Sequence, residues 1–143
     1  MTRPVKAMPL SRDALLSRAT TGYFGNVGRH ALEDVMAHIA LDAVMRIVGR
    51  SLCYKGAAAI RAHFEEFLAT YPRVDVEIYH AFADETAQRA CVHFEITLQD
   101  SAGSVQVMRN ANHFAFDETG LINDVLIFMT DTPGAGFAAG NSR

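Results

Sequence analysis

The chain has 143 residues, of which 50% are apolar and 20% are charged, and its formal net charge at pH 7 is −3. This composition is typical of a globular protein and excludes a disordered or fibrous chain. Lys and Arg are scattered singly, so nucleic acid is not an expected partner. No apolar run approaches the roughly 20 residues that span a bilayer, and the stretch MTRPVKAMPL lacks the apolar h-region of a signal peptide, so we expect no membrane partner and a cytoplasmic location.

We expect a single domain over residues 11–131, because single cores commonly reach roughly 100–200 residues. Residues 1–10 contain two prolines and no periodicity, and they are predicted to be a poorly ordered N-terminal arm. Residues 132–143 are rich in Gly and Ala and are predicted to be a flexible tail. Cys53 and Cys91 have neither paired spacing nor nearby His clusters, so free thiols are expected, with no metal and no cofactor.

Two helical segments are predicted before residue 45. Ser11 can cap a helix from Ala14 to about Phe24, and Gly25 and Gly28 mark its end. The stretch RHALEDVMAHIALDAV, residues 29–44, has apolar residues on one helical face and is also predicted to be helical. The overlapping run VMRIVG then changes to a strand-like pattern.

The clearest helix is GAAAIRAHFEEFLATYP, which Gly56 opens and Pro72 ends, since a proline ring cannot continue the hydrogen-bond ladder. Its apolar residues recur at i, i+4, i+7, i+8 and i+11, as expected for one buried face. They are Ile60, Phe64, Phe67, Leu68 and Tyr71.

After this helix the apolar period changes from about 3.6 to 2, which indicates strands. The four predicted strands are VDVEIYHAF, RACVHFEITLQD, SVQVMRNANHFAF and LINDVLIFMT. Helices followed by an antiparallel meander predict an α+β fold, with the helices packed on one face of a curved sheet.

Alternation along the strands predicts a pocket face. If Asn112 points inward, Asn110 and Met108 do so too, whereas Arg109 and His113 point to the other face. The neighbouring strands then add apolar side chains to the pocket: Phe94, Ile96, Leu98, Val125, Ile127 and Met129. A mostly apolar cavity with few polar groups is therefore predicted.

The two asparagines have two interpretations, ligand binding or satisfaction of a neighbouring backbone group, because a buried amide needs some partner. His63 lies at the margin of the helix stripe beside Phe64, where it is either a base or a packing residue. His80 shares alternation with Ile78 and is predicted at the core or the pocket edge.

On the opposite face, alternation gathers polar side chains: His93, Glu95, Thr97, Gln99, Arg109 and His113. This pattern suits a partly wet dimer interface or plain solvent exposure. Nothing in the spacing distinguishes a metal site from cross-strand polar pairing, so none is predicted.

The stretches YKGAAAIRAHF and FDETGLI, in this element order, resemble the nuclear-transport-factor-two-like superfamily, in particular its ketosteroid-isomerase-like and SnoaL-like branch. The matching residues are Gly56, Ile60, His63, Phe64, Phe116, Asp117, Gly120 and Ile122. The resemblance implies a cone-shaped, curved, antiparallel to mixed sheet with three helices from the N-terminal half on its concave face. It also implies a pocket between sheet and helices, and a homodimer formed through the sheet.

The resemblance also implies roles for single positions. Ile47 occupies the position of the isomerase general base, so that carboxylate is missing, and the residue is assigned to the pocket with Phe64. Asn112 occupies the position of the hydrogen-bond-donating acid, and Tyr23 that of the oxyanion-hole tyrosine. An amide can donate to a carbonyl oxygen but cannot transfer a proton as an acid does.

Two functions follow as hypotheses. The first is an isomerase, cyclase or dehydratase that acts on a small hydrophobic or aromatic carbonyl compound, with Tyr23 and Asn112 polarising the carbonyl and His63 moving the proton. The second is a non-catalytic module of the same fold that binds a small hydrophobic ligand.

Overall fold

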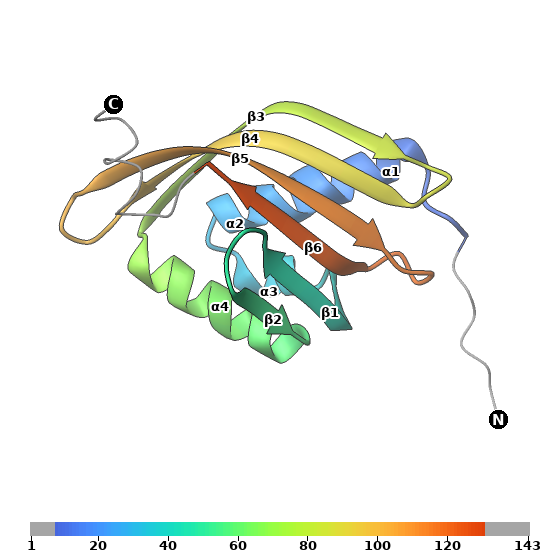
Figure 1. The fold of residues 1–143 in the computed structure, drawn as a ribbon, viewed down its shortest axis with the longest axis horizontal. Helices are drawn as coiled ribbons and strands as arrows, with labels where there is room; N and C mark the ends of the chain where they lie inside the picture. The colour runs from blue at the N-terminus through green and yellow to red at the C-terminus, as the bar shows by residue number, and fades with distance from the viewer. Residues whose placement is uncertain (1–7, 131–143) are drawn as a thin grey trace.

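The computed structural model describes residues 8–130 and has an α+β architecture (Figure 1). Its helices are α1 (Arg12–Ser17), the π-helix η1 (Arg18–Gly25), α2 (Asn26–Gly28), α3 (Leu32–Met36) and α4 (Ala57–Thr70). Its strands are β1 (Ile39–Ile47), β2 (Leu52–Lys55), β3 (Arg73–Asp84), β4 (Arg89–Gln99), β5 (Val105–Phe116) and β6 (Ile122–Met129).

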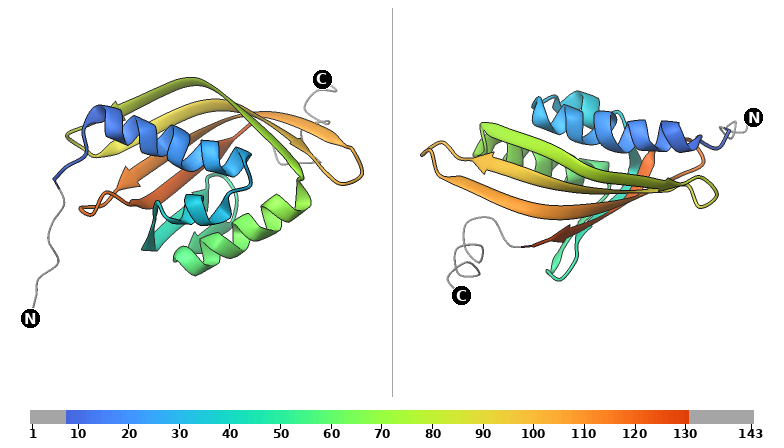
Figure 2. Two further views of the ribbon diagram at one scale, coloured as in Figure 1. Left: turned by 180° about the vertical axis from the view of Figure 1, so that it is seen from behind. Right: turned by 90° about the horizontal axis from the view of Figure 1, so that it is seen from above.

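The six strands form one mixed, curved sheet in the order β2-β1-β6-β5-β4-β3. The strands from β3 to β6 are the predicted antiparallel meander, and β1 adds parallel to β6. All the helices lie on one face of the sheet, and α1, η1 and α2 follow one another as a single rod (Figure 2). The predicted fold class, with three helical units on one face of the sheet, is confirmed.

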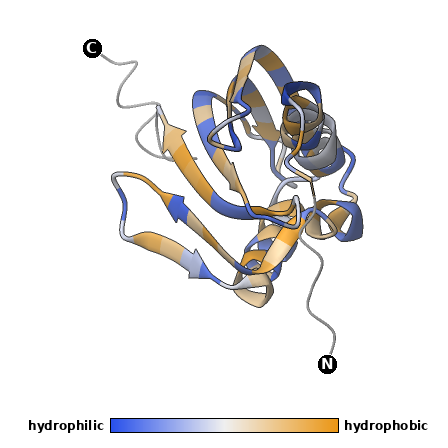
Figure 3. Cartoon of the chain, turned by 90° about the vertical axis from the view of Figure 1, so that its right-hand side faces the viewer, coloured by the Kyte–Doolittle hydropathy of each residue, from blue (hydrophilic) through white to orange (hydrophobic). Residues whose placement is uncertain are grey.

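The core lies between the inner face of the sheet and the helices. From Ala90 to Gln99 on β4 the residues alternate between buried and half-buried, and an alternation of hydrophobic and hydrophilic residues is visible on the strands in Figure 3. Leu15 of α1, Ile60 of α4 and Phe114 of β5 are almost completely buried, and they join the two layers. Burial of this apolar face is the main force that holds the helices on the sheet.

The start of the first helix agrees with its sequence signal. The Oγ of Ser11 accepts a hydrogen bond from the backbone N–H of Ala14 at 3.1 Å, as expected of an N-cap. The fourth helix also begins as predicted, since Gly56 precedes it with φ of +90°, a conformation that costs glycine little.

The prediction of a helix over residues 29–44 holds only for Leu32–Met36. Helix α3 ends at Met36, and the chain enters β1 at Ile39. There it pairs with β6, first Ile39 with Ile122 and then, after a register shift, Val44 with Asp124. Pairing with β6 outweighs the local helical pattern, because tertiary context overrides weak intrinsic propensity. Strand β2, antiparallel to β1, was not predicted.

The predicted position of His80 is also wrong. A register shift between Ile78 and His80 in the β3–β4 pairing reverses the alternation, so that His80 and Phe82 are exposed on the outer face. Beyond the shift, Ala81 and Ala83 take the inner positions. One extra residue in a bulge is enough to move every following side chain to the other face.

The domain limits proposed from the sequence, 1–10, 11–131 and 132–143, stay predictions, because residues 1–7 and 131–143 lie outside the described part of the chain. Within residues 8–130, no helix combines the length and the apolar character needed to cross a membrane.

Candidate functional site

A cavity of about 230 Å³ lies between the inner face of the sheet and the helices. Its walls come from η1 and α2, from the end of β1 with β2, from α4, and from β4, β5 and β6. The side chains that line it are mostly aromatic and aliphatic. An engineered apolar cavity of about 150 Å³ binds benzene, so this one has room for a larger apolar body.

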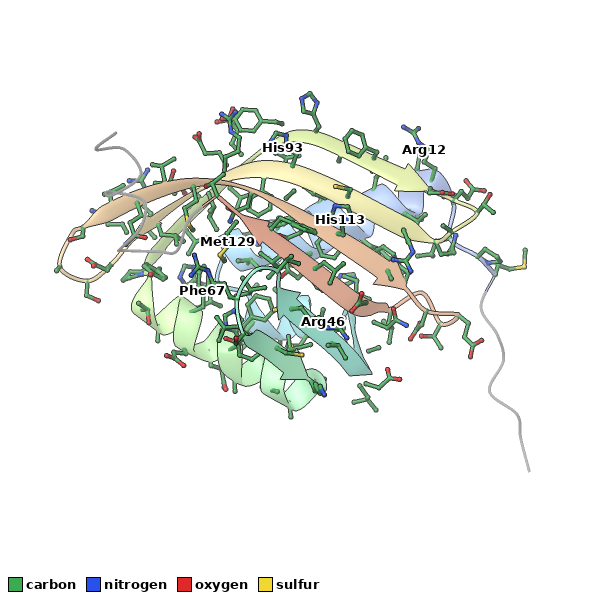
Figure 4. The ribbon with its side chains drawn as sticks, viewed as in Figure 1. Arg12, Arg46, Phe67, His93, His113 and Met129 are labelled. Carbon is green, nitrogen blue, oxygen red and sulfur yellow. The ribbon has the colours of Figure 1, made fainter. Side chains whose placement is uncertain are left out.

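Most residues predicted for the site line this cavity. They are Tyr23, Ile47, His63, Phe64, Phe94, Ile96, Leu98, Met108, Asn110, Asn112, Ile127 and Met129. Met129 of β6 and Phe67 of α4 approach it from the sheet and the helix, as labelled in Figure 4. Residues from separate segments of sequence are thus brought together around one space.

Val125, which was also predicted for the pocket, does not line the cavity. Its side chain is fully buried, opposite Phe114 in the β5–β6 pairing, and it belongs to the core beside the cavity. Further lining residues escaped the sequence analysis: Phe24, Val27, Arg50, Leu52, Tyr54 and Phe67. Phe67 was already visible in the helical stripe, whereas Arg50, Leu52 and Tyr54 belong to the unpredicted turn and strand after β1.

The π-helix η1 carries Tyr23 and Phe24 into the site. Both side chains are buried, and the Tyr23 ring meets Phe24 at 4.8 Å, Phe114 at 4.9 Å and Phe64 at 5.8 Å between ring centroids. These edge contacts fix the ring. Burial raises the pKa of the Tyr23 phenol well above its ordinary value, so the hydroxyl is a neutral donor at physiological pH. It makes no hydrogen bond to the described residues.

The two strand asparagines are in different hydrogen-bonding situations. The Oδ1 of Asn110 accepts a hydrogen bond from the backbone N–H of Thr130 at 3.3 Å. Asn112 is only 2% exposed, and its Oδ1 has no hydrogen-bond partner within residues 8–130. Such a group is costly to bury. Of the two interpretations of these amides, satisfaction of a backbone group therefore describes Asn110 and not Asn112.

His63 of α4 lines the cavity from the helix side. Its ring packs against Tyr54 at 4.5 Å and lies 6.2 Å from Phe67 between centroids. Desolvation by burial lowers its pKa, and the nearby charge of Glu66 partly opposes this. The imidazole is therefore neutral at neutral pH and can accept a proton. It forms no hydrogen bond with any described residue.

No Asp or Glu is among the described residues that line the cavity. Ile47 contributes an aliphatic side chain at the position where the isomerase resemblance implies a base. Between residues 8 and 130, no cluster of three or more His, Cys, Asp or Glu side chains could hold a metal ion. The chemistry available in this site therefore rests on one imidazole, one phenol and the amides.

A model of the SnoaL-like domain matches residues 20–125. A comparison with curated proteins found no match.

Among solved structures, the BvnE pinacolase from Penicillium brevicompactum is 18% identical with a TM-score of 0.76, covering 94% of this chain and 97% of its own. An epoxide hydrolase from Mycobacterium tuberculosis is 16% identical with a TM-score of 0.71, covering 82% and 84%. Another Mycobacterium tuberculosis protein, solved with estradiol-17beta-hemisuccinate, is 19% identical with a TM-score of 0.71, covering 86% and 96%. At these identities the structures show a shared fold.

Proposed function

The chain belongs to the SnoaL-like domain family, as the resemblance predicted, and from that premise we propose that its cavity binds a small hydrophobic or aromatic carbonyl compound and acts on it by acid–base chemistry. No cofactor takes part in this proposal. The related fold solved with a small molecule supports small-molecule binding by this chain.

One observation carries the proposal: Oδ1 of Asn112 is buried without a hydrogen-bond partner within residues 8–130, at the wall of a mostly apolar cavity. A flip of the amide exchanges its oxygen and nitrogen, so the same position can present an N–H to a ligand. Native proteins rarely leave such groups unsatisfied, and the exceptions call for an explanation. A ligand with one polar group, held by its apolar body, supplies that partner. The phenol of Tyr23, also unbonded among the described residues, lines the same space and adds a second donor.

The proposed mechanism uses three groups. The O–H of Tyr23 and the N–H of Asn112 donate to the carbonyl oxygen, which stabilises the negative charge that develops there. This makes the adjacent C–H more acidic. The neutral imidazole of His63 takes that proton. Its return to another carbon gives an isomerisation, and its transfer to a β-hydroxyl group that leaves as water gives a dehydration. Attack of the enolate carbon on a second carbonyl of the ligand, whose oxygen then receives the proton, gives a cyclisation.

The test measures removal of the proton next to the carbonyl group. Aromatic ketones and enones are incubated with the protein in deuterated water, and exchange of the hydrogens next to the carbonyl is measured by NMR. We expect His63→Ala and Asn112→Ala each to slow exchange by about 100-fold, a typical loss for a removed proton-transfer or oxyanion group. His93→Ala, on the outer face, is the matched control and is expected to exchange at the wild-type rate. Equal exchange in all four proteins would contradict the mechanism.

A second candidate is a non-catalytic module that only binds the carbonyl compound. The absence of a carboxylate among the described lining residues favours it, because acid–base chemistry in such pockets commonly uses a carboxylic acid with a tuned pKa. Binding of the same ketones that is lost in Asn112→Ala, without exchange in the wild-type protein, would select this candidate.

We also propose that two copies of the chain pair through the outer face of the sheet. Phe82 and Phe128 are 57% and 40% exposed there, and the ring of His113 lies 5.2 Å from that of Phe128. Exposed aromatic side chains on one face support an interface.

The free thiols of Cys53 and Cys91 fit the proposed cytoplasmic location.

A further inference from the structure

The turn between β1 and β2 places one charged side chain at the cavity. Gly49 adopts φ of +84°, which lets the chain reverse after β1, and Arg50 follows it and lines the cavity. Arg50 is exposed, whereas Asn112 and Tyr23 are buried. The guanidinium group is therefore at the solvent end of a space whose polar donors are at the buried end.

Arg50 is the one permanently charged residue among the described residues that line the cavity. It has no ion-pair partner within residues 8–130. Arg46, four residues earlier on β1, differs in this respect, because it binds Asp124 at 3.0 Å. The positive charge at the cavity is therefore not neutralised by the described part of the protein.

We propose that Arg50 selects ligands that carry a carboxylate at the end opposite their carbonyl group. The apolar body fills the cavity, the carbonyl oxygen meets Asn112 and Tyr23, and the carboxylate receives hydrogen bonds from the guanidinium fork, whose geometry matches its two oxygens. This inference rests on the proposed function, and it narrows the ligand class to hydrophobic or aromatic keto acids.

The probes are 4-acetylbenzoate, in which the aromatic ring separates the ketone from the carboxylate, and its uncharged methyl ester, and binding is measured by isothermal titration calorimetry. The wild-type protein is expected to bind the acid about tenfold more tightly than the ester, in the range of a charge-assisted hydrogen bond. In Arg50→Gln the two affinities are expected to become equal. Arg50→Lys is expected to keep only part of the preference, and added salt to reduce it.

Arg46→Gln is the matched control, because it removes a nearby positive charge that does not line the cavity, and it is expected to keep the full preference. If the ester binds but the wild-type protein does not prefer the acid, or if Arg50→Gln keeps the preference, the role of Arg50 is overturned while the proposed function stands. If neither probe binds to the wild-type protein, the proposed function fails, and the role of Arg50 fails with it.

Discussion

Asn110 and Asn112 show how two identical residues on one strand face can have different roles. Both are buried on the inner face of β5, at 5% and 2% exposure. Asn110 lies beside the end of β6 and bonds the backbone of Thr130, whereas Asn112 lies between Val92 and Ile127 in the sheet. Both of its cross-strand neighbours are apolar, and its Oδ1 has no partner within residues 8–130, which supports a position kept for a ligand.

The two asparagines predict opposite responses to an apolar substitution of similar shape. Asn112→Leu removes an unpaired buried polar group, which costs about 1–3 kcal/mol, so the free energy of unfolding is expected to rise by about 1 kcal/mol. Asn110→Leu removes a hydrogen bond and is expected to be less stable than Asn112→Leu by about 1–2 kcal/mol. Urea denaturation measures both. An Asn112→Leu protein that is markedly less stable than wild type would show that this amide has a structural partner.

The lowered pKa of His63 predicts a pH dependence of stability. The unfolded chain binds a proton at His63 near pH 6.5, whereas the folded protein does so only at lower pH, so the free energy of unfolding should fall as pH decreases below about 6.5. His63→Phe keeps a ring against Tyr54 and should flatten this fall. A residual slope is expected from His38, whose pKa is also lowered. Burial and the charge of Arg18 lower it, and the charge of Asp34 partly opposes them.

Glu66→Gln is the control for the sign of the effect. The charge of Glu66 raises the pKa of His63. Its removal should therefore increase the difference between the His63 pKa values of the folded and unfolded protein, and make the free energy of unfolding fall further as pH decreases. Denaturation curves measured at several pH values test both variants. An unchanged pH profile in His63→Phe would show that this imidazole does not titrate differently in the folded protein.

At the level of single residues, the sequence predicted much of the cavity wall, because strand alternation assigns a whole face from one residue. Val125 was the exception: it follows the alternation of β6 but lies against Phe114 in the core. Alternation tells which face a residue occupies but not whether a neighbour covers it. The unpaired state of Asn112 depends on long-range neighbours and therefore could not be predicted from the sequence.

Among the elements, η1 places the phenol of Tyr23 in the cavity. π-Helical turns are rare and occur frequently at functional sites. Gly22 lies within η1 just before Tyr23, and a Cβ atom at this position would lie 2.9 Å from Nε2 of His38. The close approach of helix and imidazole therefore requires glycine here.

Gly22→Ala is expected to destabilise the protein by about 1 kcal/mol, since the added methyl group overpacks against the His38 ring. In a His38→Ala background the obstacle is removed, and the same substitution should be neutral or stabilising, because alanine has the higher helix propensity. Thermal unfolding of the four proteins of this cycle gives the coupling energy. Equal effects of Gly22→Ala in both backgrounds would contradict the contact.

The features that were not predicted leave no periodic signal in the sequence. The first half of β1 was taken for helix, and its pairing with β6 involves a partner distant in sequence. His80 was assigned to the inner side of β3, and a bulge reverses the alternation there. β2 pairs with its neighbour β1 but is only four residues long and mostly exposed, which is too short for a period. Helix α4 and the meander have strong local periodicity and were predicted.

At the scale of the whole molecule, the inner face of the sheet is covered by helices and the outer face is not (Figure 2). The outer face carries His93 and His113, labelled in Figure 4, together with the exposed rings of Phe82 and Phe128. An exposed apolar group on a sheet face is stabilised when a partner covers it.

Phe82→Glu with Phe128→Glu is expected to convert the proposed dimer to monomer, because two charges would be buried in the interface. Sedimentation velocity measures the change. Glu65→Lys, at an exposed position of α4 on the other side of the sheet, is the control and should leave the dimer intact. A wild-type protein that sediments as a monomer at all concentrations would contradict the proposal.

The central claim is that the side-chain amide of Asn112, whose Oδ1 has no partner within residues 8–130, turns its N–H to a carbonyl oxygen inside a mostly apolar cavity. Its most direct test compares the affinities of an aromatic ketone and of the hydrocarbon in which a methylene replaces the carbonyl, for the wild-type protein and for Asn112→Leu. We predict that the wild-type protein prefers the ketone by about tenfold, the value of one buried hydrogen bond, and that Asn112→Leu loses this preference while still binding the hydrocarbon. Equal affinity of the wild-type protein for both compounds, or a ketone preference that persists in Asn112→Leu, would contradict the claim.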